Sequence, residues 1–157
     1  MVYFVTDALK HANDRAPAMP NTPSPVVVKA LEKWHAGVAS RDTSGLAGLL
    51  HPEVVFRSPM AFKPYEGAMV VSVILSTVLE VFEDFAYHRE FFSPDGRHVV
   101  LEFSARVGDK SLKGIDMITF DAGGRITEFE VMIRPFNALQ ALGTEMGNRL
   151  ELRGRTT

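Results

Sequence analysis

The chain has 157 residues, of which 46% are hydrophobic and 23% charged, a composition typical of one globular domain. A net charge of −2 gives no electrostatic reason to bind nucleic acid, and the lack of cysteine excludes disulfides, thiolate metal sites and cysteine nucleophiles. No segment has the roughly 18 consecutive apolar residues of a membrane span, and the N-terminus is too polar after Val5 for a signal peptide. We therefore expect a cytoplasmic protein with neither nucleic-acid nor membrane partners.

A proline-rich stretch separates the N-terminal segment from the rest of the chain. Four of the nine prolines lie between residues 17 and 25, which is typical of an extended linker. Met19 lies within this stretch, which leaves open whether residues 1–18 belong to the native protein. The predicted organisation is an N-terminal extension (1–24), one domain (25–150) and a short tail (151–157).

The first half of the domain is predicted to be mostly helical. Ser24 and Pro25 are typical of an N-cap and a first helical position, and apolar residues then recur at helical spacing: Val27, Leu31, Trp34 and Val38. A short helix from Thr43, a strand over 53–58, a loop over 59–67 and a helix over 68–84 follow. This last helix is apolar around most of its girth, which predicts that it is covered on more than one side.

The second half is predicted as four antiparallel strands and a final helix. The expected strands are 85–92, 98–107, 111–120 and 125–134, and the helix spans about 136–150. A two-residue turn at Gly108 and Asp109 pairs Leu101 with Asp116, and a four-residue loop over 121–124 pairs Asp116 with Phe129. Both choices place the same residues on one face: Val99, Leu101, Phe103, Ala105, Leu112, Asp116, Ile118, Phe120, Phe129, Val131 and Ile133.

Asp116 is the one ionisable residue on this apolar face. An ionised carboxylate there would lose several kcal/mol of hydration free energy, and burial can raise a carboxyl pKa by about 3–5 units. Such a group usually has a partner or a function. His88 or Arg89 on the preceding strand could face the same side of the sheet: with His88, Asp116 would form an acid/base dyad, whereas Arg89 or a backbone donor would give it a structural role.

The opposite face of the same strands mixes charged and apolar residues. Its charged and polar members are Glu102, Ser104, Arg106, Lys113, Glu128, Glu130 and Arg134, and its apolar members are Val100, Ile115, Met117 and Met132. This mixture is typical of a protein interface. We expect a homodimer through this outer sheet face.

Three helices followed by strands, with the strand–turn–strand IDMITFDAGGRI at 115–126, resemble the NTF2-like superfamily over residues 25–150. Within it, the chain is similar to the ketosteroid isomerase and SnoaL-like (polyketide cyclase-like) branch. The resemblance implies an α+β cone in which three N-terminal helices pack on a curved antiparallel sheet and enclose an apolar pocket, with a C-terminal helix. In ketosteroid isomerases the aspartate of this strand is a protonated acid in the oxyanion hole, and Asp116 occupies its position.

Three other positions depart from the family pattern. The isomerase base is an aspartate before a proline, and Ser58 stands in its place; the oxyanion tyrosine corresponds to Trp34. The aspartate that SnoaL-like cyclases use on the last strand corresponds to Val131. Because a serine cannot shuttle a proton unaided, true ketosteroid isomerase activity is not expected.

An apolar pocket with few polar groups suits a steroid, a polyketide or a terpenoid. We predict an isomerase, cyclase or dehydratase with Asp116 and His88 as catalytic residues; the alternative is a non-catalytic ligand-binding or dimeric interaction domain that has lost the base. No metal-ligand spacing or phosphate-binding loop is present, so neither metal nor cofactor is expected. The predicted ligand-binding residues are Trp34, Phe56, Ser58, Tyr65, Leu101, Phe103, Phe129 and Val131.

Overall fold

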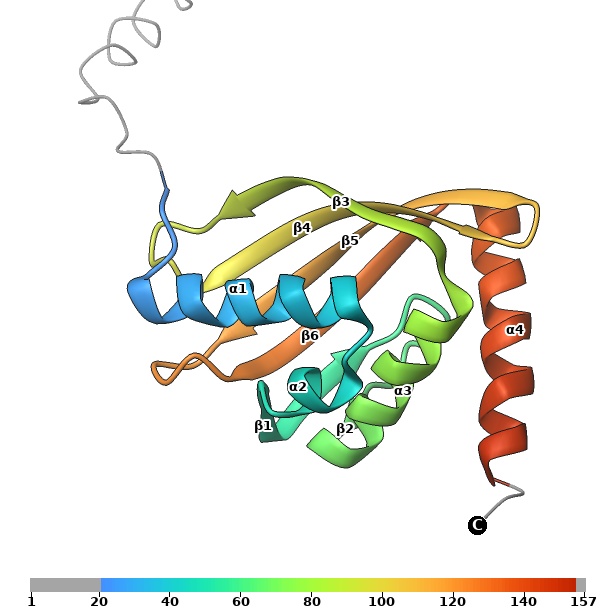
Figure 1. Ribbon diagram of the computed structural model, residues 1–157, viewed down its shortest axis with the longest axis horizontal. Coiled ribbons are helices and arrows are strands. Elements are labelled where there is room, and N and C mark those ends of the chain that lie inside the picture. The colour runs from blue at the N-terminus through green and yellow to red at the C-terminus, as the bar shows by residue number, and fades with distance from the viewer. Residues whose placement is uncertain (1–20, 155–157) are drawn as a thin grey trace, which may run out of the picture.

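A curved six-stranded sheet wraps around helices in the computed structural model, which describes residues 21–154 (Figure 1). Most of the predicted N-terminal extension therefore lies outside the described residues. The strand order is β2-β1-β6-β5-β4-β3. In chain order the elements are α1 (Pro25–Ser40), α2 (Thr43–Ala47), β1 (Leu50–Arg57), β2 (Tyr65–Glu66), α3 (Ala68–Val81), β3 (Glu83–Phe92), β4 (His98–Val107), β5 (Lys110–Phe120), β6 (Ile126–Arg134) and α4 (Phe136–Gly154).

The α+β class is confirmed, but the sheet is mixed rather than wholly antiparallel. Strand β1 runs parallel to β6, with Phe56 opposite Phe129. These two strands are far apart in the sequence, so no tight turn between them imposes an antiparallel pairing. The two-residue strand β2 lies within the predicted loop and pairs with β1.

The predicted register is confirmed for one hairpin and wrong by two residues for the next. Leu101 lies opposite Asp116, as the turn between β4 and β5 requires. Between β5 and β6, Asp116 lies opposite Val131 instead of Phe129, because an irregularity at Thr119 and Phe120 shifts the pairing. A shift of two residues keeps every side chain on its predicted face, so the apolar inner face is as expected.

The helices close the concave side of the sheet. Helix α1 is followed by its C-cap Arg41, which adopts a left-handed conformation (φ 55°). The Arg41 side chain donates hydrogen bonds to the carbonyl oxygens of Leu79 and Phe82 at the end of α3. Helix α3 stops at Val81, earlier than predicted, because β3 begins at Glu83. It contacts α2, β1 and α4, which explains its apolar residues on several sides.

Helix α4 stands at one end of the sheet, beside α3 (Figure 1). It continues to Gly154, four residues beyond its predicted end. Arg149 and Arg153 of α4 form ion pairs with Glu80 of α3, which ties the two helices together. Within residues 21–154, no helix is long and apolar enough to cross a membrane.

Candidate functional site

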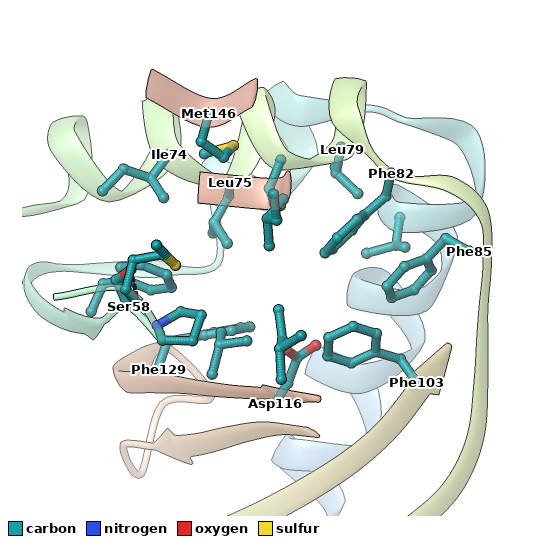
Figure 2. Close-up of a pocket in the computed structure, with 18 of the residues that line it drawn as sticks. Ser58, Ile74, Leu75, Leu79, Phe82, Phe85, Phe103, Asp116, Phe129 and Met146 are labelled. Carbon is teal, nitrogen blue, oxygen red and sulfur yellow. Dashed lines mark hydrogen bonds between the residues drawn. The ribbon is translucent and has the colours of Figure 1, made fainter. Parts of the chain in front are cut away.

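A cavity of about 280 Å³ lies between the inner sheet face and helices α1, α3 and α4 (Figure 2). Its walls are mainly aliphatic and aromatic. The polar side chains among its described lining residues are Trp34, Ser58, Tyr65, Tyr87 and Asp116. A mostly apolar cavity with a few polar groups is the usual form of a small-molecule site.

Asp116 lies at the floor of this cavity, on the inner face of β5, as the sequence predicts (Figure 2). It is only 6% exposed. Burial raises the pKa of this carboxyl to about 7, although a hydrogen bond from Tyr87 acts in the opposite direction. Near neutral pH both the acid and the carboxylate are populated, so this one group can donate or accept a proton.

Tyr87 of β3 links Asp116 to helix α1. Its hydroxyl donates to Oδ2 of Asp116 at 2.8 Å and accepts a hydrogen bond from Nε1 of Trp34 at 2.9 Å. Burial, followed by the nearby Asp116, raises the pKa of Tyr87 well above its usual value of 10. Tyr87 therefore stays protonated and remains a hydrogen-bond donor.

The expectation that His88 or Arg89 faces the cavity is wrong. Nε2 of His88 lies 2.7 Å from the hydroxyl oxygen of Ser104, and Arg89 pairs with Glu102. Side chains alternate along a strand, so with Tyr87 turned inward its neighbour His88 points outward. Neither residue lines the cavity, and the predicted His–Asp dyad does not form.

Tyr87 is the polar site residue that the sequence analysis missed. The pairing of β3 with β4 shifts between Tyr87 and Glu90, so a strict alternation counted from the strand end fails there. The available signal was that Tyr87 is the one aromatic residue in the segment AYHRE. A buried tyrosine hydroxyl usually has a hydrogen-bond partner, and the buried carboxyl of Asp116 also requires one, so the two groups can be expected to pair.

Most predicted ligand-binding residues do lie together in the cavity wall. Those found there are Trp34, Phe56, Ser58, Tyr65, Phe103, Phe129 and Val131. Leu101 does not: it is fully buried in the hydrophobic core and is not among the lining residues. The hydroxyl oxygen of Ser58 accepts a hydrogen bond from the backbone nitrogen of Met60 at 3.1 Å, which gives this serine a part in the local turn.

Two helices contribute wall residues that were not predicted. Helix α3 supplies one wall, with Leu75, Leu79 and the following Phe82, and α4 supplies another, with Met146 (Figure 2). Gly147 of α4 also lines the cavity. The sequence signal for α3 was that apolar residues surround most of the helix, because one side contacts the core and another side faces the cavity. Helix α4 carries no comparable signal, because its position depends on packing between distant elements.

A metal site was not expected from the sequence. Among the residues that the structure describes, no group of three or more His, Asp or Glu side chains is placed to hold a metal ion.

Comparisons with known proteins agree with this architecture. No curated protein is significantly similar to the chain. A crystal structure of a steroid delta-isomerase from Pseudomonas aeruginosa is 63% identical, with a TM-score of 0.83, over 85% of this chain and 97% of that one. A crystal structure of an uncharacterised protein with a cystatin-like fold from Silicibacter pomeroyi is 33% identical, with a TM-score of 0.76, over 80% of this chain and 88% of that one.

More distant structures show the fold alone. An NTF2-like protein of unknown function from Burkholderia xenovorans is 15% identical, with a TM-score of 0.61, over 71% of this chain and 85% of that one. The fold is therefore NTF2-like, as the sequence predicted. The model of the SnoaL-like domain matches residues 31–129, which is more than half of the chain and includes both Tyr87 and Asp116. The chain belongs to the SnoaL-like domain family.

Proposed function

We propose that the cavity binds a small hydrophobic carbonyl compound of the steroid, polyketide or terpenoid type, and that Asp116 acts on its carbonyl group. The observation that carries this proposal is a single buried carboxyl with a pKa of about 7 at the floor of an apolar cavity. The similarity to a protein called a steroid delta-isomerase supports a ligand of this class and a reaction of the isomerase type.

In its protonated form Asp116 donates a hydrogen bond to the carbonyl oxygen. This bond strengthens as negative charge develops on that oxygen during enolisation, and the apolar walls increase its effect. Ser58 stands where the family's base would be, and Asp116 is the one carboxyl among the described lining residues. If the reaction removes a proton from carbon, the ionised form of Asp116 is therefore the carboxylate that accepts it. If the reaction needs only an acid, the protonated form of Asp116 supplies the proton.

The proposal is tested with a thermal-shift screen of steroids, aromatic polyketides and terpenoid epoxides. At a hundredfold excess over Kd, a ligand stabilises the folded state by about 2.7 kcal/mol, which is easily measured. We expect one class to raise the Tm of the wild type and to lose most of this effect in Asp116→Asn. Glu128→Gln, which changes an exposed carboxylate paired with Arg57, is the matched control.

Turnover of the identified compound is then measured in the same three proteins. A loss of about 10²- to 10⁴-fold in Asp116→Asn, with Glu128→Gln unchanged, is the expected size for a general acid or base. Equal turnover in all three proteins would contradict the catalytic role. The absence of any thermal shift in a stably folded wild type would contradict the ligand class.

A non-catalytic ligand-binding domain is the second candidate function. Ser58 favours it, because the position of the isomerase base holds a hydroxyl that is engaged in a backbone turn. A ligand that raises the Tm in an Asp116-dependent manner but is recovered unchanged after long incubation would identify this function.

We also propose a homodimer through the outer sheet face. Met117 of β5 and Met132 of β6 are 37% and 49% exposed there, and Phe91 of β3 is 51% exposed. Sedimentation at micromolar concentration is expected to give the mass of a dimer, and Met132→Glu is expected to give a monomer. A wild-type monomer would contradict this proposal and would leave the ligand proposal intact.

A further inference from the structure

The hydrogen-bond chain from Trp34 to Asp116 runs in one direction only. An indole has a single N–H donor and no acceptor, so Trp34 can only donate to the hydroxyl oxygen of Tyr87, which lies 2.9 Å from Nε1. The hydroxyl has one proton of its own, and its other partner is Oδ2 of Asp116 at 2.8 Å. Tyr87 therefore accepts from Trp34 and donates to Asp116.

Aromatic packing holds both rings of this chain in place. Trp34 is 3% exposed, and its ring centroid lies 5.2 Å from that of Phe129. The ring of Tyr87 meets Phe85 edge-on at 4.8 Å and His35 edge-on at 5.1 Å between centroids. Close packing of this kind leaves little room for the Tyr87 hydroxyl to turn toward another acceptor.

The two oxygens of the carboxyl consequently have different environments. Within residues 21–154, Oδ2 receives the bond from Tyr87, and Oδ1 has no hydrogen-bond partner in the protein. Figure 2 shows the carboxyl directed into the hollow from the sheet. Because the bond from Tyr87 draws electron density from Oδ2, Oδ1 is the more basic of the two oxygens, and the acid form is expected to carry its proton there.

We propose that Trp34 and Tyr87 are positioning residues that keep Oδ2 of Asp116 as a permanent hydrogen-bond acceptor, so that a bound ligand exchanges a hydrogen bond or a proton with Oδ1 alone. This inference rests on the proposed function and narrows its substrate class. A carboxyl with one available oxygen suits a ligand with a single acceptor oxygen, such as a ketone or an epoxide, at one end of an apolar body. It does not suit a guanidinium or amidinium group, which needs both oxygens.

The other titratable groups near this chain are arranged around Tyr87. Glu90 of β3 acts on Tyr87 electrostatically and lies 2.7 Å from Nε2 of His35 on α1. Arg41 and Asp84 line a hollow on the side of Tyr87 toward the end of α1, and Arg41 is held by two backbone carbonyls of the α3 end. Asp116 itself has Tyr87 as its one hydrogen-bond partner among the described side chains, so Tyr87 is the residue through which its protonation is adjusted.

The test is a pH titration of the Asp116 carboxyl carbon by ¹³C NMR in protein labelled at aspartate, with no ligand added. The resonance is assigned by its loss in Asp116→Asn. Removal of the Tyr87 donor destabilises the carboxylate, so we expect the titration midpoint in Tyr87→Phe to rise by about one pH unit or more above the wild-type value. Trp34→Phe leaves the hydrogen bond from Tyr87 to Asp116 in place but removes the donor that polarises the Tyr87 hydroxyl. We therefore expect a smaller rise in the titration midpoint.

Tyr65→Phe is the matched control, because Tyr65 lines the same cavity without a hydrogen bond to Asp116, and its midpoint is expected to equal that of the wild type. An unchanged or lowered midpoint in folded Tyr87→Phe would overturn the inference. If Tyr87→Phe does not fold, Trp34→Phe decides the question by the same criterion. Since the titration uses no ligand, its failure would leave the ligand screen untouched, and an empty ligand screen would not alter the titration.

Discussion

Charged side chains have opposite environments on the two faces of the sheet. On the outer face, Glu102 forms ion pairs with Arg89 and Lys113, and Arg106 forms ion pairs with Glu83 and Asp84. On the inner face, Asp116 is surrounded by apolar side chains and has one neutral hydrogen-bond donor. Only two residues of β5 lie between Lys113 and Asp116, yet one charge is screened by water and the other is not.

This difference shows in the direction of the pKa shifts. Arg89, followed by Lys113, lowers the pKa of Glu102, whereas burial raises that of Asp116 to about 7. An exposed ion pair adds little to stability and is a common surface feature. A buried carboxyl that weakens the fold at neutral pH is rarer, and such groups are concentrated at functional sites. Each prediction below either tests or refines this contrast.

The largest expected effect is the pH dependence of stability that Asp116 causes. The pKa of this carboxyl is about 7 in the folded state, whereas its ordinary value, taken for the unfolded state, is 3.8. Between these two pH values the folded state therefore binds more protons than the unfolded state. The free energy of unfolding should therefore fall as pH rises from 4 to 8, by about 4 kcal/mol in total. Asp116→Asn should lose this contribution, as denaturant titrations at several pH values will show. Parallel curves for the two proteins would contradict the raised pKa.

The second prediction concerns Gly114, on the inner face of β5 two residues before Asp116. A Cβ atom there would lie 2.5 Å from the ring of Phe103 and 2.7 Å from the carbonyl oxygen of Met132. Because a backbone atom and a fully buried ring cannot easily move, Gly114→Ala should lower the free energy of unfolding by about 1–3 kcal/mol. Chemical denaturation measures this change, and a variant as stable as the wild type would show that the inner face is loosely packed.

Turn geometry made Asp116 predictable from the sequence. The two-residue turn at Gly108 and Asp109 sets the pairing of β4 with β5, and this pairing places the carboxyl opposite Leu101 on the apolar face. The loop after Phe120 was misjudged by two residues, but an even error leaves the faces unchanged. Local chemistry was therefore enough to find the carboxyl.

The partner of Asp116 could not be found in the same way. Tyr87 lies in β3, whose pairing with β4 is interrupted twice, so no turn determines which of its side chains face inward. The walls formed by α3 and α4 depend on how distant elements pack, and no local sequence rule encodes this. Surface residues such as His88 become distinguishable from cavity residues only once the strand irregularities are known.

The third prediction separates cavity walls from core on the inner side. Gly147 of α4 lines the cavity, and a Cβ added to it would meet no atom within 4 Å. Alanine stabilises a helix interior by up to about 1 kcal/mol relative to glycine, so Gly147→Ala should raise the free energy of unfolding slightly. Gly147→Leu should instead narrow the cavity and reduce the thermal shift given by the longest ligands of the screen. An equal shift for long and short ligands in Gly147→Leu would place the ligand away from α4.

The smallest effect is expected on the outer face, from Glu102→Gln. The carboxylate pairs with Arg89 and Lys113, and both cations are more than half exposed, so water and salt screen the attraction. Since these partners lower the pKa of Glu102, its contribution is present at neutral pH and is lost as pH falls, opposite to that of Asp116. The Tm at low salt should drop less than in Gly114→Ala, and the difference from wild type should vanish in 1 M salt. A larger drop in Tm that persists in high salt would mean that the outer face is shielded from water, as in a dimer. The contrast between the two faces would then hold only for the isolated chain.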